Sequence, residues 1–293
     1  MKKPVIVKLG GSAITNKNHK YTLAPKKKLQ RIFKEIASYS GPLVVISGGG
    51  SFGHPAVLDR GLETAQGASF VRQKMEILRI NLVEYFLDNN LPVHNFSPYS
   101  IGIVKRGKVF EGPLRRKVEI TMNRGEIPFT SGDVVKDVKK SYVVLSGDDQ
   151  AVYLANALEA ERLVMVLNDT AEGIHPTYPI KREPPLKKLT KTKWNQIKSL
   201  YRSYEKKNTT ADVTGGIFGK IDLLFKVTPN TEALLVGSQK KRTVKRALTG
   251  GVTAIKTKKT LGTYIPAEER ISGGIPFHEK PPFDNPPKCI QRG

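Results

Sequence analysis

Val5-Ile6-Val7-Lys8-Leu9-Gly10-Gly11-Ser12 lies near the start of this sequence, and Ser47-Gly48-Gly49-Gly50-Ser51-Phe52-Gly53-His54 follows a second apolar run, Leu43-Val44-Val45-Ile46. Short apolar runs bounded by glycine predict strands that are buried on both faces. Glycines after such a strand let the backbone pass close to a ligand, and their N–H groups can bind phosphate oxygens. The second loop has four glycines within six residues, an entropic cost that a plain turn does not require. Each stretch therefore predicts a strand that leads into an anion-binding loop.

Strands and helices alternate along the rest of the chain. A long helix runs from Val71, because Met75, Leu78, Leu82 and Phe86 recur at steps of three and four residues. We expect further strands at residues 92–96, 127–129, 162–167 and 233–236, a hairpin at 134–145, and helices at 29–36, 148–159 and 194–204. This order predicts an α/β fold, a three-layer αβα sandwich with a mainly parallel central sheet. Ligands of such sheets bind beyond the carboxyl ends of the strands, where both glycine loops fall.

The chain has 293 residues, enough for one large α/β domain. No internal repeat or linker divides it, so we expect residues 1–265 to form a single domain. Residues 266–293 contain six prolines and no apolar periodicity, and we expect this Pro-rich C-terminal tail to wrap the surface or to be disordered.

The net charge is strongly positive, at +23, because 49 Lys and Arg residues stand against 26 Asp and Glu residues. Such a charge attracts nucleotides, phosphorylated metabolites, nucleic acids and acidic membranes. The basic residues are spread over many segments, and only 8% of the residues are aromatic. Dedicated RNA-binding proteins usually add an aromatic stacking platform. A solvated basic surface is therefore favoured over a nucleic-acid function.

No apolar run is long enough to span a bilayer, and the N-terminus does not have the pattern of a signal peptide. Cys289 is the only cysteine, so an intrachain disulfide is excluded. These features predict a cytoplasmic protein without a membrane span.

Two further motifs supply charged residues. Asp212-Val213-Thr214-Gly215-Gly216-Ile217-Phe218-Gly219-Lys220 ends like a Walker A motif, but Thr214 replaces its first glycine and Ile221 replaces its Ser or Thr. The segment is therefore not a P-loop, although it offers another phosphate-sized loop beside a lysine. Ser146-Gly147-Asp148-Asp149 places two acids at the start of a helix. One of the two acids is explained as the N-cap of the helix, and the other is available to hold lysines or magnesium in place.

His54 closes the second glycine loop. A lone histidine is more often structural, but at the edge of an anion-binding loop its imidazole can donate to a phosphate oxygen. Lys8, at the carboxyl end of its strand, is placed to aim its ammonium group at a ligand of the first loop. Many strand-to-helix turns carry glycines, so the prediction of a phosphate site depends on the motifs taken together.

The order of these motifs resembles the amino acid kinase superfamily. Lys-x-Gly-Gly-Ser, Gly-Gly-Gly-Ser-Phe-Gly-His, Ser-Gly-Asp-Asp and Asp-Val-Thr-Gly-Gly-Ile followed by Lys occur in that order, and the resemblance covers roughly residues 4–265. The histidine version of the second loop is similar to that of the isopentenyl phosphate kinases. The resemblance implies ATP-dependent, Mg²⁺-assisted phosphorylation of isopentenyl phosphate to isopentenyl diphosphate by a homodimer.

The resemblance also implies a role for each matching residue. Among the residues implied to be catalytic, Lys8 and Lys220 neutralise the transferring phosphoryl group, Lys17 lies near the phosphates, and Asp148 orients the lysines. Asp149 is implied to assist with magnesium. The residues implied to bind the nucleotide are Gly10, Gly11, Ser12, Asp169, Gly173, Gly215 and Gly216. Those implied to bind the acceptor phosphate are Gly49, Gly50, Ser146, Gly147 and His54. His54 is implied to be catalytic as well. An acceptor with an apolar tail needs an apolar wall as well, for which the long helix offers Phe70, Met75, Ile77, Leu78 or Phe86.

One segment departs from the family pattern. Residues 168–175, Asn-Asp-Thr-Ala-Glu-Gly-Ile-His, stand where the family has Thr-Asp-Val-Asp-Gly-Ile-Tyr and are one residue longer, so the nucleotide preference stays open. The enzymatic alternative is a fosfomycin-kinase-like protein or another small-molecule kinase of this superfamily. The alternative from another class is a non-catalytic, basic nucleic-acid-binding protein on the same fold. The joint presence of Lys8, Lys17, His54, Asp148 and Lys220 favours catalysis, since a binding protein has no physical need for the whole set.

Overall fold

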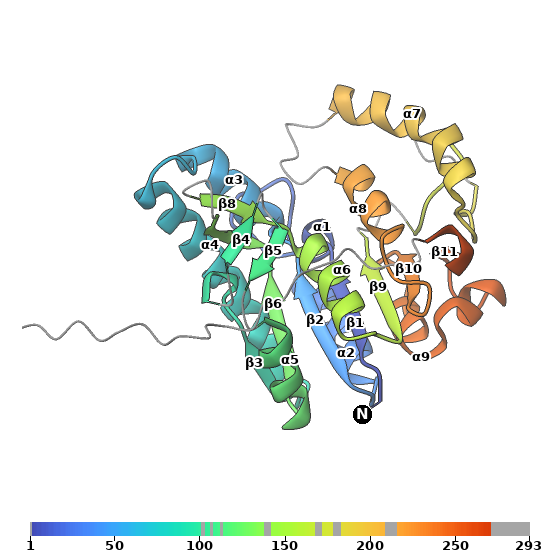
Figure 1. Ribbon diagram of the computed structural model, residues 1–293, viewed down its shortest axis with the longest axis horizontal. Helices are drawn as coiled ribbons and strands as arrows, with labels where there is room; N and C mark the ends of the chain where they lie inside the picture. Colours follow the sequence, from blue (N-terminus) through green and yellow to red (C-terminus); the bar gives the residue numbers. More distant parts are fainter. Residues whose placement is uncertain are drawn as a thin grey trace, which may run out of the picture.

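The computed structural model describes residues 2–100, 103–105, 108–111, 114–137, 142–167, 172–177, 183–208 and 216–270. Its centre is a seven-stranded sheet in the order β11-β10-β9-β1-β2-β6-β3 (Figure 1). The strands are β1 (Val5–Leu9), β2 (Leu43–Ser47), β3 (Val93–Asn95), β6 (Ile127–Ser131), β9 (Arg162–Val166), β10 (Glu232–Val236) and β11 (Thr263–Ile265). Neighbouring strands run parallel, except for the antiparallel pair of β10 and β11. The prediction of a mainly parallel sheet is confirmed.

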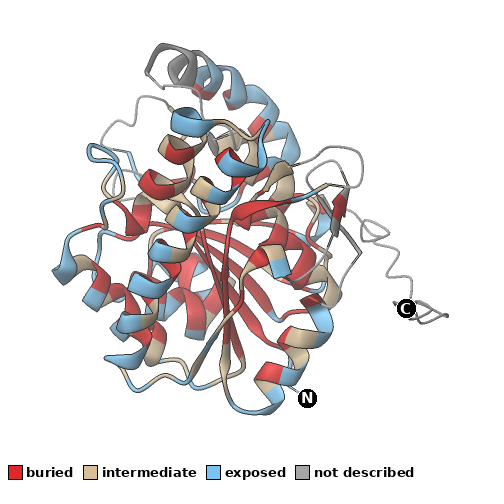
Figure 2. Ribbon diagram, turned by 90° about the vertical axis from the view of Figure 1, so that its left-hand side faces the viewer, coloured by how far each residue is buried: buried red, intermediate tan, exposed pale blue. Residues whose placement is uncertain are grey.

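Helices cover both faces of the sheet and make the three predicted layers. One face packs against α2 (Lys26–Ala37), α3 (Gly50–Arg60), α4 (Ala65–Leu87) and α9 (Thr243–Lys256). The other packs against α5 (Leu114–Asn123) and α6 (Gly147–Ala157), while α8 (Gly216–Leu224) packs against α6 and α7 (Lys191–Asn208) packs against α8. The buried residues fill the sheet and the inner sides of these helices, and the exposed residues lie on the outer sides (Figure 2).

The alternation of side chains along β1 decides which layer each residue meets. Val5, Val7 and Leu9 belong to the core on the α2 and α4 side, whereas Ile6 belongs to the core on the α6 side. Because successive side chains of a strand point to opposite faces, Lys8 shares the face of Ile6. This geometry turns the ammonium group of Lys8 towards the N-terminus of α6.

The predicted strands and helices lie where the structure has them, with shifted ends. The predicted hairpin is the antiparallel pair β7 (Asp133–Lys136) and β8 (Tyr142–Leu145). The sequence pattern does not predict α5, α9, β11 or the pair β4 (Ile103–Lys105) and β5 (Lys108–Glu111). In α9 the reason is visible, because Gly250-Gly251 interrupts the apolar spacing and is typical of a loop.

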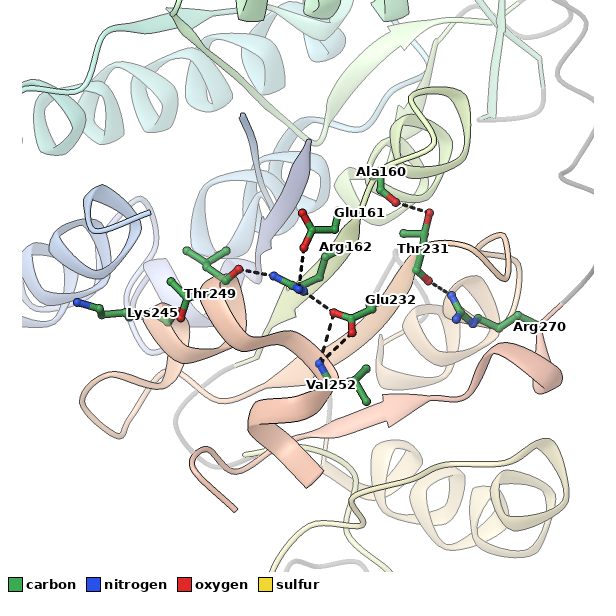
Figure 3. A network of polar contacts seen from close by, with 10 residues as sticks. Ala160, Glu161, Arg162, Thr231, Glu232, Lys245, Thr249, Val252 and Arg270 are labelled. Carbon is green, nitrogen blue, oxygen red and sulfur yellow. Dashed lines mark hydrogen bonds and ion pairs between the residues drawn. The ribbon is translucent and has the colours of Figure 1, made fainter. Parts of the chain in front are cut away.

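A network of polar contacts around the buried Arg162 supports the kink in α9 (Figure 3). The Arg162 Nε atom donates to the Glu232 carboxylate at 2.5 Å, and a second guanidinium nitrogen donates to the Leu248 carbonyl. The Glu232 carboxylate also accepts from the Val252 N–H at 3.4 Å, just after the kink. Gly251 has φ +51° and ψ −138°, and a Cβ atom there would lie 1.9 Å from a Glu232 oxygen. A residue without a side chain is therefore required at the kink.

Replacing Gly251 with alanine is expected to lower the free energy of unfolding by about 1–3 kcal/mol, through backbone strain and the clash with Glu232. Urea unfolding measures this loss. Gly125→Ala is the matched control, because Gly125 has φ +77° but nothing within 4 Å of an added Cβ atom. Equal losses in the two variants would show that the Glu232 contact has no effect.

The described part of the chain ends on a buried arginine. Arg270 follows a short turn, Ala267–Glu269, and donates to the carbonyls of Thr228 at 2.9 Å, Pro229 at 3.0 Å and Thr231 (Figure 3). Residues 266–270 thus pack on the domain, and residues 271–293 of the predicted tail lie outside the described residues. Among the described residues, every helix is either too short or too polar to cross a bilayer.

Candidate active site

The two glycine loops meet through their backbones at the carboxyl end of the sheet. β1 leads into Gly10 and the short helix α1 (Gly11–Ile14), while β2 leads into Gly48, Gly49 and α3. A Cβ atom on Gly11 would lie 2.3 Å from the Gly50 nitrogen, and one on Gly48 would lie 2.7 Å from the Gly11 nitrogen. The glycines are thus required by this close approach, and the N–H-rich loops face one common space.

Hydrogen bonds of Thr15 and Ser51 join the two glycine loops. The Thr15 hydroxyl donates to the Gly11 carbonyl at 2.7 Å and accepts from the Ser51 N–H at 2.9 Å. Gly50 between them has φ +49°, and an added Cβ atom would lie 2.1 Å from the Thr15 hydroxyl. His54 follows one turn after the start of α3, so these bonds fix the helix that carries it relative to the first loop.

Asp148 lies at the start of α6 and holds two lysines. The Ser146 hydroxyl accepts from the Asp148 N–H at 3.0 Å, so Ser146 is the N-cap. The Asp148 carboxylate is 2.6 Å from the Lys8 ammonium nitrogen and 3.2 Å from that of Lys220. Both Lys8 and Asp148 are buried. The predicted contact between Asp148 and the two lysines is therefore present.

The two lysines keep Asp148 ionised. Burial by itself would raise the pKa of this carboxyl group, but the charges and hydrogen bonds of Lys8 and Lys220 outweigh burial and lower the pKa to about 2. In return, one carboxylate lets two ammonium groups lie close together without full repulsion. The lysines are thereby held in place before a polyanionic ligand arrives.

This pKa gives a pH-dependent contribution to stability. A carboxyl group whose pKa is lowered by folding stabilises the protein above its unfolded pKa of about 3.9, and that stabilisation is lost as the pH falls towards about 2. We expect the difference in unfolding free energy between the native protein and Asp148→Asn to shrink by about 2 kcal/mol between pH 5 and pH 2. Urea unfolding at several pH values measures it. A difference that stays constant over this range would contradict the ion pairing.

The loops, the lysines and α4 enclose a cavity of about 430 Å³, a size that suits a small-molecule ligand. Its polar end is lined by the predicted residues Lys8, Gly10, Gly11, Ser12, Lys17, Gly49, Gly50, His54, Ser146, Gly147, Asp148 and Lys220. Its apolar end is lined by Val57, Leu58, Val71, Met75, Val134 and Val144. The cavity therefore joins a cationic, N–H-rich end to a hydrocarbon-lined end.

The remaining predicted nucleotide-binding residues are placed as follows. Gly173 packs against β11, where an added Cβ atom would lie 2.7 Å from the Thr263 hydroxyl, and it does not line the cavity. Gly216 begins α8, whereas Asp169 and Gly215 lie outside the described residues. Asp149 lies in the first turn of α6.

Segment 168–175 is the one that departs from the family pattern, and its C-terminal part is hydrogen-bonded to α7. The Tyr201 hydroxyl accepts from the His175 N–H at 2.8 Å and donates to the His175 carbonyl at 2.9 Å. Burial lowers the pKa of His175, so its ring is neutral at physiological pH. Glu172 is paired with Lys240 in the loop after β10, at 3.1 Å.

The apolar wall differs in part from the expected one. Of the candidates on α4, Met75 lines the cavity, Leu78 and Phe86 are fully buried in the core, and Ile77 is exposed. Phe70 packs against Tyr21 and is not among the lining residues. Val71, one turn before Met75, and the β7–β8 valines complete the wall. The spacing along α4 shows which residues share a stripe but not which of them meet the hairpin.

The sequence pattern does not predict a buried ion pair that lies next to this wall. Arg79 of α4 donates to the Ser131 hydroxyl at 2.8 Å and to the Asp133 carboxylate at 2.6 Å. Asp133 lines the cavity and accepts from the Val134 N–H at 2.7 Å. The pair thus ties α4 to the hairpin that carries Val134. One signal was present, because Arg79 follows Met75 by four residues on the buried stripe of α4.

Metal-binding side chains are the next feature of the described residues. No group of three or more His, Cys, Asp and Glu side chains gathers anywhere in the described ranges to form a metal cage. Mg²⁺ is usually held by substrate phosphates and one or two carboxylates. Asp149, which the resemblance links to magnesium, follows Asp148 in the first turn of α6 and is not among the residues that line the cavity.

Comparisons with known proteins agree with this geometry. The model of the amino acid kinase family matches residues 3–233. An isopentenyl phosphate kinase of Methanocaldococcus jannaschii is 27% identical over 266 residues, which cover 84% of this chain and 95% of that protein. An isopentenyl phosphate kinase of Arabidopsis thaliana is 27% identical over 315 residues, which cover 89% of this chain and 94% of that protein.

Solved structures share the fold. An X-ray structure of isopentenyl phosphate kinase superposes with a TM-score of 0.71 at 22% identity, over 89% of this chain and 99% of that one. A carbamate kinase from Giardia lamblia bound to AMP-PNP has a TM-score of 0.56 at 15% identity, over 90% of this chain and 98% of that one. Since the family model spans most of the chain and the glycine loops, lysines and Asp148 come together in the structure, this chain belongs to the amino acid kinase family.

Proposed function

We propose that this protein transfers the γ-phosphoryl group of ATP to isopentenyl phosphate and thereby makes isopentenyl diphosphate and ADP. The observation that carries the proposal is the cavity, whose lining combines phosphate-binding groups, His54 among them, with an apolar wall. The relatives named isopentenyl phosphate kinase support the same acceptor.

The polar end suits the joining of two polyanions. Lys8, Lys17 and Lys220 face the cavity, and one carboxylate, Asp148, partly balances them. Glycine-loop N–H groups and the N-termini of α3 and α6 add partial positive charge at the same place. In this arrangement Gly10, Gly11 and Ser12 bind the nucleotide phosphates, while Gly49, Gly50, Ser146, Gly147 and His54 bind the acceptor phosphate.

The reaction needs positioning and charge neutralisation more than proton transfer. An oxygen of the acceptor phosphate is already anionic, so it attacks the γ-phosphorus without a general base. A new P–O bond forms as the bond to the bridging β–γ oxygen breaks, and ADP leaves with that electron pair. Lysines fixed in advance neutralise the charge of the transferring group, and Mg²⁺ held by the ATP phosphates supplies further neutralisation when bound.

The apolar end suits a short hydrocarbon tail. Val71 and Met75 of α4 line the cavity together with Val134 and Val144 of the hairpin. Burying a tail of a few carbon atoms there contributes roughly 0.8 kcal/mol per methylene group. A polar acceptor such as acetylglutamate or UMP gains nothing from this wall.

The proposal is tested by ADP production from Mg·ATP with isopentenyl phosphate, dimethylallyl phosphate, fosfomycin, acetylglutamate and UMP as acceptors. We expect kcat/KM to be highest for isopentenyl phosphate. Preference for fosfomycin would assign the protein to the enzymatic alternative. Absence of turnover with every acceptor would overturn the proposed activity.

We also propose that the protein is a cytoplasmic homodimer. The family resemblance implies a dimer, and α4 offers an apolar face for it, since Ile80 and Leu87 are 53% and 54% exposed. The single cysteine suits a reducing compartment. Light scattering coupled to gel filtration measures the oligomeric state, and a monomer would contradict the dimer.

Nucleic-acid binding on the same fold remains a second prediction. Residues 240–259 carry eight Lys and Arg residues and no acid, and Lys187 donates to the Lys256 carbonyl at 3.1 Å, so a second basic segment lies beside the first. Electrostatic binding of this kind weakens steeply with salt. Tight RNA binding that survives moderate salt, together with absent kinase activity, would favour a nucleic-acid-binding function over catalysis.

A further inference from the structure

Lys17 lies on a hairpin-like loop whose base is fixed. A β-bridge joins Thr15 to Leu23, and the Asn16 N–H donates to the Thr22 carbonyl at 2.9 Å. Lys17 follows directly and lines the cavity. The position of its ammonium group therefore depends on how the rest of the loop is held.

The far side of this loop is attached to α3. Asp59, near the end of that helix, accepts from the Lys20 ammonium group at 2.6 Å and from the Tyr21 hydroxyl at 2.7 Å. The Tyr21 N–H donates to the Ser51 carbonyl at 2.9 Å, and the Thr22 carbonyl accepts from the Ser51 hydroxyl at 2.9 Å. Backbone and side-chain bonds thus join the same loop to both ends of one helix.

Tyr21 adopts a conformation that the surrounding contacts must maintain. Its φ is +56°, in the left-handed region that a non-glycine residue rarely adopts. Its ring packs edge-on against Phe52 of α3 and Phe70 of α4, at centroid distances of 6.2 and 6.5 Å. Strained residues of this kind persist where neighbours fix them, and they concentrate at functional sites.

We propose that Asp59 is a positioning residue, which holds the Lys17 loop on α3 and so fixes Lys17 relative to His54. The inference rests on the proposed function, because it assigns Lys17 to the nucleotide phosphates and His54 to the acceptor phosphate. His54 is the fifth residue of α3 and Asp59 lies five residues further along it, so one helix sets the positions of both groups. In-line transfer requires such a fixed separation between donor and acceptor.

Protonation states favour the attachment at physiological pH. Hydrogen bonds from Lys20 and Tyr21 lower the pKa of Asp59, so its carboxylate stays ionised. Burial and the bond to Asp59 raise the pKa of Tyr21 to about 12, so its hydroxyl stays a donor. Arg60, near the Asp59 carboxylate, and Lys74, whose ammonium nitrogen is 5.0 Å from the centre of the Tyr21 ring, add positive charge around the pair.

The test compares Asp59→Asn with Asp88→Asn. Asp88 is an exposed aspartate at the end of the neighbouring helix α4 and takes no part in the cavity. We expect Asp59→Asn to lower kcat about 10-fold, while KM for isopentenyl phosphate stays close to the native value, because small misplacements of a reacting group are costly. Asp88→Asn is expected to leave both constants unchanged.

A double-mutant cycle separates positioning from general destabilisation. If Asp59 acts through Lys17, Asp59→Asn has no further effect in a Lys17→Met background. Additive losses in the cycle, or a native kcat in Asp59→Asn, would overturn the proposal. Asp59→Glu keeps the carboxylate and is expected to restore part of the rate.

Hydrogen exchange tests the attachment without any substrate. We expect the amides of Asn16, Tyr21 and Thr22 to exchange about 10-fold faster in Asp59→Asn than in the native protein or in Asp88→Asn. Unchanged exchange would show that Asp59 does not hold the loop. An inactive native protein would instead overturn isopentenyl phosphate as the acceptor, so the two failures are distinguishable.

Discussion

Replacing Lys8 with methionine is expected to lower kcat roughly 1,000-fold, while KM for ATP changes little. Methionine keeps most of the side-chain volume at this buried position and removes only the charge. The Lys8 ammonium group is fixed by the Asp148 carboxylate at 2.6 Å, so it meets the transferring phosphoryl group without reorganisation. Charge that is fixed in advance stabilises the transition state more than the ground state. Initial rates of ADP formation with saturating acceptor measure the effect.

Lys3→Met is the matched control, because Lys3 precedes the same strand and is half-exposed in a pair with Glu159. It is expected to retain the native kcat. Thermal unfolding of both variants separates loss of chemistry from loss of fold. A Lys8→Met enzyme within a few-fold of the native rate would remove Lys8 from the transfer step.

Replacing His54 with alanine is expected to raise KM for isopentenyl phosphate about 10- to 100-fold and to remove most activity at low acceptor concentration. A hydrogen bond to a charged group contributes about 1.5–3 kcal/mol, which corresponds to this range. The affinity for ATP is expected to stay nearly intact, because the nucleotide phosphates are assigned to Gly10, Gly11 and Ser12. Steady-state kinetics with each substrate varied in turn measure the two effects separately.

His94→Ala is the control for His54→Ala, because His94 is exposed on β3 and lies away from the cavity lining. His54→Gln retains a side-chain N–H donor and is expected to recover part of the acceptor affinity. Unchanged acceptor kinetics in His54→Ala would assign the histidine a structural role in α3.

The sequence predicts the centre of this fold because its signals are local. β1 and β2 are short apolar runs that end in glycines, and the period of a buried strand is visible within five residues. The positions of the glycine loops follow from the parallel sheet, since all such loops leave the carboxyl ends of the strands. The cationic end of the cavity could therefore be expected before any coordinates.

Elements without a clear local pattern could not be expected. α9 contains Gly250-Gly251, and local propensity favours a loop there. In the folded protein the helix continues through a kink, because Glu232 accepts from the Val252 N–H and Arg162 bonds to the Leu248 carbonyl. These partners come from other parts of the chain, so the helix depends on tertiary contacts.

Strand period and glycine conformation act over a few residues, so the amino-acid sequence alone shows which segments form strands and which edge of the sheet carries the glycine loops. The contacts between distant side chains are visible only in the folded protein, apart from the pairing of Asp148 with the lysines, which the family resemblance implies. Folding brings Arg79 to Asp133 and Asp59 to the Lys17 loop. Such contacts depend on the relative placement of whole helices and strands, which the packing of the core sets and which residue spacing along the chain does not encode.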